Sequence, residues 1–190
     1  VQQGVYLGQV GVLGFQDHAV RCVLVSRAAG MADAAVPEGV DLPGRGHTGM
    51  ITYMRTDSPR LAAEAVEACR AHISSQYDDR YLPPKPNIYT ATGRSQDAHE
   101  AVRPTDVTLT PERMKDALSS EQFRLYDLIW RRYVASQMTD AVVANSTLLA
   151  EAGRVGMRQL GESLIFEGWS AVWPLDLKGD RLEPAKEGES

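Results

Sequence analysis

The stretch GMITYMRTDS, residues 49–58, follows a glycine-rich loop and leads into a predicted helix. In an extended backbone, residues two apart point to the same side and lie about 6.5–7 Å apart. Tyr53, Arg55 and Asp57 would then share one face that combines a phenol, a permanent cation and a carboxylate. A phenol can attack a phosphate, and a guanidinium can hold that phosphate through two parallel hydrogen bonds. The alternative is an ordinary edge strand with a half-buried tyrosine and solvated charges.

Two more stretches stand out downstream: SQDAHEAVRPT, residues 95–105, and LYDLIWRRYVASQM, residues 125–138. Together with residues 49–58, and in the same order, they resemble the motifs of the type IA DNA topoisomerases, the family of bacterial topoisomerase I. The resemblance is dense from about Glu38 to Met138, looser from Thr139 onward and poor before Pro37. Three matches in the right order are far more specific than any one of them.

The resemblance implies that Tyr53 attacks one strand of DNA and forms a 5′-phosphotyrosyl bond, leaving a free 3′-hydroxyl. Such a transesterification keeps the bond energy and needs no ATP. In the full-length enzyme it relaxes negative supercoils. Arg55 is expected to stabilise the phenolate, whose ordinary pKa is near 10, and to bind the scissile phosphate. The partner of the chain is therefore expected to be single-stranded DNA.

Three further residues are candidates for contacts with DNA. His99 is implied to contact a phosphate or relay a proton, and the alternative is a histidine satisfied by a neighbouring carboxylate. Arg103 either binds phosphate or braces the fold, and bracing is the favoured interpretation. Arg94 supplies local positive charge. Asp57 is more consistent with orienting Arg55 or capping a helix than with acting as a general base.

Composition limits the setting in which the chain works. The net charge is −5 over 190 residues, which argues against strong non-specific binding to duplex DNA but allows a local basic patch. Two cysteines, Cys22 and Cys69, are too few for a disulfide framework or a zinc cluster. The sequence contains no run of 18 apolar residues, so it does not predict a membrane span. We expect a cytoplasmic protein that associates with the nucleoid.

The resemblance also implies Mg²⁺, which the family enzymes bind through an acidic TOPRIM domain upstream of the tyrosine. No cluster of aspartates and glutamates with that spacing precedes Tyr53, so we expect no metal site in this chain. The chain resembles the tyrosine-bearing middle of a topoisomerase. We therefore expect that it needs the TOPRIM domain and cannot relax supercoiled DNA alone.

The predicted fold class is α+β: a mainly helical domain followed by strands of an incomplete β-rich neighbour. Residues 1–36 show no legible pattern, residues 37–138 are predicted to form the helical domain, and residues 176–190 a charged tail. Within residues 139–175, the stretches 141–144 and 163–166 are predicted to be strands. The resemblance implies that residues 139–175 belong to a β-rich arch domain.

Ser58 is predicted to cap a helix that runs to about Tyr77. Its predicted apolar stripe is Leu61, Ala65, Val66, Cys69 and Ile73. Ser119 and Gln122 predict a capping box before a second helix. The predicted core stripe of that helix is Phe123, Tyr126, Trp130, Tyr133 and Val134.

Two alternatives to the enzyme remain open at this stage. The chain could be a catalytically incompetent module that binds single-stranded DNA or a protein partner. It could also be a non-functional remnant, as the illegible first 36 residues suggest.

Overall fold

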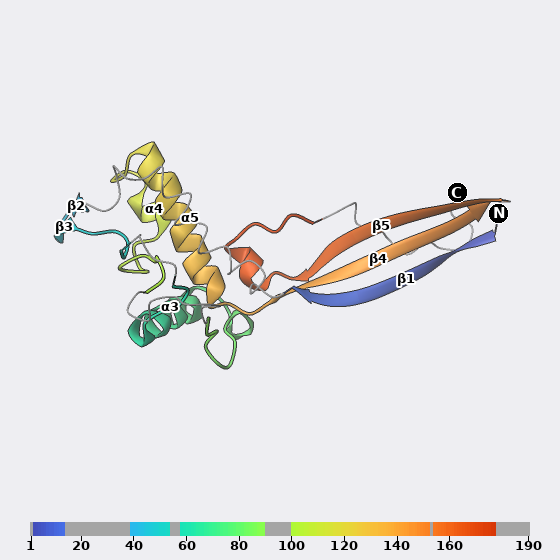
Figure 1. Ribbon diagram of the computed structural model, residues 1–190, viewed down its shortest axis with the longest axis horizontal. Helices are drawn as coiled ribbons and strands as arrows, with labels where there is room; N and C mark the ends of the chain where they lie inside the picture. Colours follow the sequence, from blue (N-terminus) through green and yellow to red (C-terminus); the bar gives the residue numbers. More distant parts are fainter. Residues whose placement is uncertain (1, 14–38, 54–57, 90–99, 153, 178–190) are drawn as a thin grey trace. The chain divides into compact units, whose positions relative to one another are not determined.

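A computed structural model describes residues 2–13, 39–53, 58–89, 100–152 and 154–177. The chain divides into two compact units, one formed by residues 1–14 and 140–190 and the other by residues 15–139. The first contains a three-stranded sheet, and the second contains the three α-helices of the described residues and a two-stranded sheet (Figure 1). The segregation of helices from the main sheet is that of an α+β protein, as predicted.

Helix α5, Ser120–Ser136, supplies much of the core of the helical unit. Ser119 and Gln122 form the predicted capping box: the Ser119 hydroxyl accepts from the Gln122 amide, and the Gln122 side chain accepts from the Ser119 amide. The predicted stripe is buried at four positions, Tyr126, Trp130, Tyr133 and Val134, and Phe123 is half-buried. The short helix α4, Pro111–Met114, begins after Thr110 with proline in its first turn, a position where proline is favoured.

Helix α3, Ala63–Gln76, begins later than the sequence predicted. Its N-cap is Ala62 rather than Ser58, and no side chain caps it. The Ser58 hydroxyl instead accepts a hydrogen bond from the Arg60 amide at 3.3 Å, a local turn that competes with helix formation. The predicted apolar stripe is buried at Ala65, Cys69 and Ile73, so the period was correct although the start was wrong.

The proline-rich connector after α3 lies against the C-terminal end of α5. It contains the 3₁₀ turn η2, Asp79–Tyr81, and is otherwise irregular, as three prolines in four residues require. Asn87 and Tyr89 donate to the Ser136 carbonyl at 3.0 and 2.7 Å, and Gln137 donates to the Asn87 carbonyl at 3.0 Å. The Asn87 and Tyr89 side chains thus satisfy the Ser136 carbonyl, which the end of the helix leaves without an intrahelical partner.

The glycine-rich stretch before the tyrosine, predicted as a turn-rich loop, forms a short hairpin around that turn. Strands β2, Val40–Leu42, and β3, Gly46–Thr48, pair in antiparallel fashion. Gly39 has φ +83°, and a β-carbon there would lie 2.7 Å from the Thr48 carbonyl oxygen. Glycine is therefore required at position 39, at the open end of the hairpin opposite its turn.

The sheet unit is built from three strands of equal length, β1, Gln2–Leu13, β4, Ala141–Ala152, and β5, Val155–Phe166, in the order β1-β4-β5 (Figure 1). The sequence predicted only the pieces 141–144 and 163–166 and no element before residue 37. Antiparallel pairing of β1 with β4 along most of its length overrides the unfavourable glycines.

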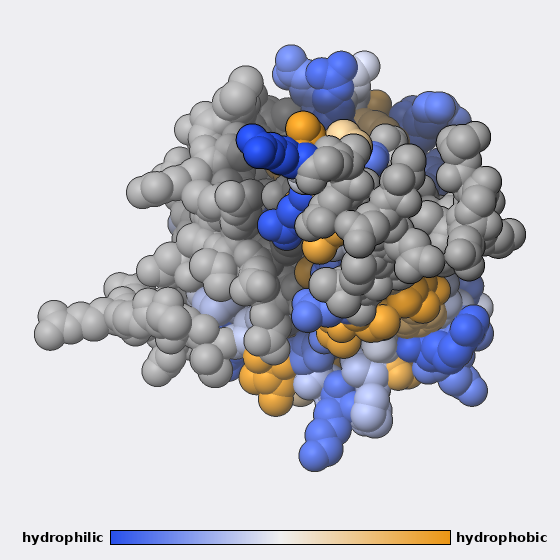
Figure 2. All heavy atoms as spheres, turned by 90° about the vertical axis from the view of Figure 1, so that its right-hand side faces the viewer, coloured by the Kyte–Doolittle hydropathy of each residue, from blue (hydrophilic) through white to orange (hydrophobic). Residues whose placement is uncertain are grey.

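The end of this sheet is anchored by η3, Gly168–Ala171, whose buried Trp169 donates its indole N–H to the Leu13 carbonyl at 2.9 Å. Apolar side chains nevertheless reach the surface on the strands, at Val10, Val12, Met157, Leu160 and Ile165. Figure 2 shows hydrophobic residues at the surface among hydrophilic ones on the face it presents. Across the described ranges, no helix combines the length and apolar character needed to cross a membrane.

Candidate functional site

The backbone that leads to Tyr53 is tied to residues 100–105, the end of the second motif. The Thr105 hydroxyl donates to the Gly49 carbonyl at 2.6 Å, and the Thr105 amide donates to the Met50 carbonyl at 3.1 Å. Ile51 forms an isolated antiparallel bridge with Pro104. Residues 49–53 therefore do not form the regular strand that the sequence predicted, although the two motifs do meet.

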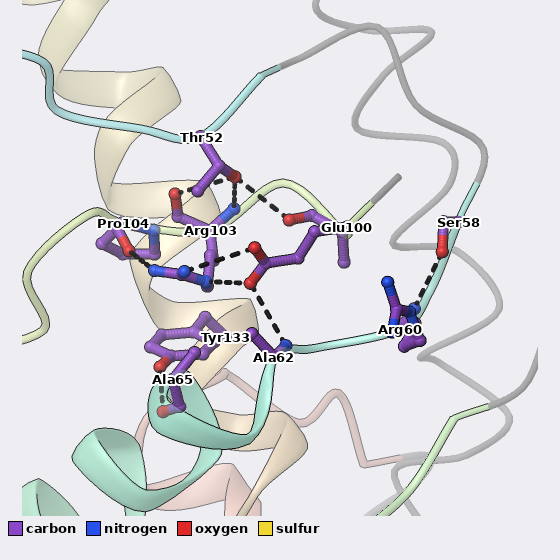
Figure 3. A network of polar contacts seen from close by, with 10 residues as sticks. Thr52, Ser58, Arg60, Ala62, Ala65, Glu100, Arg103, Pro104 and Tyr133 are labelled. Atoms are coloured by element: carbon purple, nitrogen blue, oxygen red, sulfur yellow. Dashed lines mark hydrogen bonds and ion pairs between the residues drawn. The ribbon is translucent and has the colours of Figure 1, made fainter. Parts of the chain in front are cut away.

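Thr52, the residue before Tyr53, carries the most connections in this contact (Figure 3). Its amide donates to the Arg103 carbonyl at 2.9 Å. Its hydroxyl donates to the Ala101 carbonyl at 3.1 Å and accepts from the Arg103 amide at 3.0 Å. Backbone and side chain of Thr52 are thus both bound to one short segment.

The same segment also holds the chain that follows the motif. Glu100 forms an ion pair with Arg103, and its carboxylate accepts from the Ala62 amide at 3.3 Å, at the N-terminus of α3 (Figure 3). The Ala101 amide donates to the Arg60 carbonyl at 2.8 Å. Contacts on both sides of Tyr53 in the sequence therefore converge on residues 100–103.

Tyr53 itself is 65% exposed. Among the tyrosines whose burial the structure describes, it is the only exposed one. Tyr126 and Tyr133 are buried, and their hydroxyls donate to the Leu109 and Ala65 carbonyls at 2.5 Å. Burial raises the pKa of both phenols well above the ordinary value, which makes them poor nucleophiles.

The other predicted site residues divide into two groups. Arg55, Arg94 and His99 lie outside the described residues, as does Asp57. Arg103 is described: its side chain is 17% exposed, and it donates to the Glu100 carboxylate and, at 3.0 Å, to the Pro104 carbonyl. The structure thus places Arg103 in internal contacts.

Thr52 and Glu100 were not selected from the sequence. Glu100 appeared only as one possible partner of a histidine, and Thr52 looked like a spacer between two motif residues. The only sequence signal for either is its adjacency to a motif residue, because the partners lie about fifty positions apart or in another element.

An ion pair and a cavity lie near this contact. Arg45 of the β2–β3 hairpin pairs with Asp106 at 2.5 Å. Partial burial opposes ionisation of Asp106, but hydrogen bonds from Arg45 and Thr108 lower its pKa overall. A cavity of about 560 Å³ lies between one side of α3 and residues 103–108, with Tyr133 also lining it.

His72 of α3 is another lining residue of that cavity. Its ring meets the Trp130 ring edge-on at 5.5 Å, and burial lowers its pKa. Within the part of the chain that the structure describes, no group of three or more histidine, cysteine, aspartate or glutamate side chains is placed to hold a metal ion.

Comparisons with known proteins identify the origin of these motifs. Residues 46–190 match a family model described as DNA topoisomerase. DNA topoisomerase 1 of Treponema pallidum (strain Nichols) is 46% identical over 178 residues, which cover 92% of this chain and 24% of that protein. DNA topoisomerase 1 of Escherichia coli (strain K12) is 46% identical over 132 residues, which cover 70% of this chain and 15% of that protein.

A solved structure agrees. Full-length topoisomerase I from Thermotoga maritima matches with a TM-score of 0.68 and 26% sequence identity, covering 97% of this chain and 31% of that one. The chain spans about a quarter or less of the length of the Treponema pallidum and Escherichia coli proteins. On the family match and these similarities, the chain belongs to the bacterial DNA topoisomerase I family, the type IA topoisomerases.

Proposed function

We propose that the chain supplies the nucleophile for cutting and rejoining one strand of DNA, and that Tyr53 is that nucleophile. The phenol loses its proton, its oxygen forms a bond to the phosphorus, and the bond from phosphorus to the 3′ oxygen breaks. The 3′ oxygen takes up a proton, so the products are a 5′-phosphotyrosyl bond and a free 3′-hydroxyl. The reverse attack rejoins the strand without ATP. In the full-length enzyme the cycle relaxes negative supercoils at the nucleoid.

One observation carries this proposal: Tyr53 is exposed while the residue before it is held by three hydrogen bonds. A nucleophile must reach a substrate and must also start from a defined position, because misplacement by about 1 Å can cost a hundredfold in rate. The tyrosines of α5 do not meet the first need, because burial in the core keeps their hydroxyls from reaching a substrate.

The cations of the site take separate roles in this proposal. Arg55 holds the scissile phosphate and stabilises the phenolate, and His99 contacts a phosphate or relays a proton. Arg94 adds positive charge for the DNA backbone. Arg103 braces the site instead of binding DNA, because its guanidinium already donates to Glu100 and to the Pro104 carbonyl.

Among the described residues, no group of three or more histidine, cysteine, aspartate or glutamate side chains is placed to hold a metal ion. We propose that the Mg²⁺-binding groups of the working enzyme belong to its TOPRIM domain. By this reasoning the 190-residue chain alone does not relax supercoiled DNA. Robust relaxation by the isolated chain with Mg²⁺ would contradict it.

A covalent-adduct assay tests the nucleophile. The chain is incubated with a 5′-labelled and, separately, a 3′-labelled single-stranded oligonucleotide, with and without a supplied TOPRIM domain, and adducts are trapped with denaturant. Only the 3′-labelled strand is expected to remain on the protein, because the tyrosine holds the 5′ phosphate of the downstream piece. Tyr53→Phe should abolish the adduct.

Tyr89→Phe is the matched control, because it also removes one tyrosine hydroxyl but at a half-buried position bound to Ser136. Adducts that persist in Tyr53→Phe would refute the assignment of the nucleophile. Oligonucleotide binding without any adduct under either condition would favour a binding module derived from the family.

A further inference from the structure

We infer that Thr52 is a positioning residue for Tyr53. The segment Glu100–Arg103 is the fixed support to which Thr52 is bound. This inference rests on the proposed role of Tyr53. Thr52 does not touch the DNA in this scheme; its hydroxyl fixes the backbone from which the Tyr53 side chain departs.

The hydroxyl of Thr52 is used on both sides. It donates to the Ala101 carbonyl and accepts from the Arg103 amide, while the Thr52 amide donates to the Arg103 carbonyl. The amide and carbonyl of Arg103 are therefore both bound to Thr52: the amide donates to the Thr52 hydroxyl (Figure 3), and the carbonyl accepts from the Thr52 amide. Two contacts of different direction to one residue restrict rotation of the peptide that precedes Tyr53, which a single hydrogen bond would not do.

The segment Glu100–Arg103 is itself held by contacts that do not involve Thr52. The Arg103 guanidinium donates twice to the Glu100 carboxylate and once to the Pro104 carbonyl, and Pro104 is buried. Glu100 in turn accepts from the Ala62 amide at the start of α3. The ion pair joins the two ends of the segment to each other. Moving the segment away from the start of α3 would require breaking the Glu100–Ala62 hydrogen bond, which is charge-assisted and therefore about twice as strong as a neutral one, and the bond from the Ala101 amide to the Arg60 carbonyl.

The choice of threonine has a chemical reason. Valine has nearly the same shape but cannot donate or accept a hydrogen bond, and serine keeps the hydroxyl while losing one methyl group. Thr52→Val and Thr52→Ser therefore separate the hydroxyl from the packing. Ser119→Ala serves as a control, because it loses the α5 capping box but touches none of the residues in this network.

The experiment compares the wild-type chain, the two Thr52 variants and Ser119→Ala, each supplied with the TOPRIM domain. Single-turnover adduct formation is measured at saturating single-stranded oligonucleotide, and the Kd of the oligonucleotide is measured separately by fluorescence anisotropy. Amide hydrogen exchange at Thr52 and Ala101 is followed by NMR on the chain alone. Both amides keep their acceptors in every variant, so their exchange reports how firmly the segment is held.

In Thr52→Val we expect adduct formation to slow by about ten- to a hundredfold with the Kd within twofold of wild type. The Thr52 and Ala101 amides should exchange at least about tenfold faster. Thr52→Ser should stay within about threefold of wild type in every readout. Ser119→Ala should lower stability but leave the rate of adduct formation unchanged. If Thr52 mattered only for the stability of the fold, a destabilising change such as Ser119→Ala would slow adduct formation too.

The experiment distinguishes failure of the proposed nucleophile from failure of the positioning role of Thr52. If the wild-type chain forms no adduct, the proposed function fails, and amide exchange alone decides whether Thr52 holds the segment. If the wild type forms adducts and Thr52→Val forms them equally fast, the positioning role is overturned while the nucleophile stands. Unchanged exchange in Thr52→Val also overturns it.

Discussion

Glu100→Ala should destabilise the helical unit by more than an ordinary surface substitution. The change removes an acceptor for the Ala62 amide and both contacts to the Arg103 guanidinium. Hydrogen bonds to charged groups contribute about 1.5–3 kcal/mol when well buried, whereas exposed ion pairs contribute about 0–1 kcal/mol. The side chains of Arg103 and Glu100 are 17% and 27% exposed, which places the pair between these limits. We expect a loss of about 2 kcal/mol, or about 8 °C in Tm for a unit of this size.

A double-mutant cycle isolates the ion pair from the other contacts. Urea unfolding followed by helical circular dichroism gives the free energy of unfolding of wild type, Glu100→Ala, Arg103→Ala and the double variant. In the Glu100→Ala background, Arg103 has already lost its carboxylate, so its removal should cost at least about 1 kcal/mol less than in wild type. Glu67→Ala, at an exposed position of α3, is the control and should stay within about 0.5 kcal/mol of wild type.

Two results would refute this reasoning. Costs of Glu100→Ala and Arg103→Ala that add to within about 0.3–0.5 kcal/mol would show that the two side chains do not act together. A Glu100→Ala variant as stable as Glu67→Ala would show that the carboxylate does not hold the start of α3.

Three further predictions test other parts of the helical unit. Ser119→Ala should lower the free energy of unfolding by about 1 kcal/mol through loss of the capping box, measured by urea unfolding. His72 has a folded pKa below the ordinary 6.5 because of burial, so the unfolded state binds more protons between the two values. Stability should therefore fall as the pH drops below 6.5, and Tm measured from pH 7.5 to 5 should fall less in His72→Gln. Burial raises the pKa of the Cys69 thiol to about 12, against a smaller opposing effect of Arg70. In a Cys22→Ser background, a thiol reagent at pH 8 should therefore react only after denaturant is added, and rapid labelling of the native chain would contradict this.

The helices were predictable because their signals are local. The capping box at Ser119 joins residues three apart, and the stripe through Tyr126 and Trp130 repeats every three or four residues. Both could be recognised without knowing the rest of the fold. The start of α3 was mispredicted because the Ser58 hydroxyl accepts from the Arg60 amide in a local turn. Serine can form such a turn as readily as it can cap a helix, so the sequence alone does not separate the two.

The long sheet was only partly predictable because its stabilisation is not local. Strand β1 pairs with β4, more than one hundred residues away in the chain, and its glycines disfavour a strand when read alone. Only the partner strand supplies the hydrogen bonds that make this sequence extended.

By itself the sequence determined the family, the core helix α5 with its cap, and the identity of Tyr53 as the candidate nucleophile. The tertiary structure alone decided how the backbone before Tyr53 is held. Thr52 forms hydrogen bonds with Ala101 and Arg103, and Glu100 joins Arg103 to the start of α3. The physical reason is sequence distance. Motifs and helical periods depend on residues a few positions apart, whereas the contacts around Thr52 join segments about fifty residues apart that meet only when the core has folded.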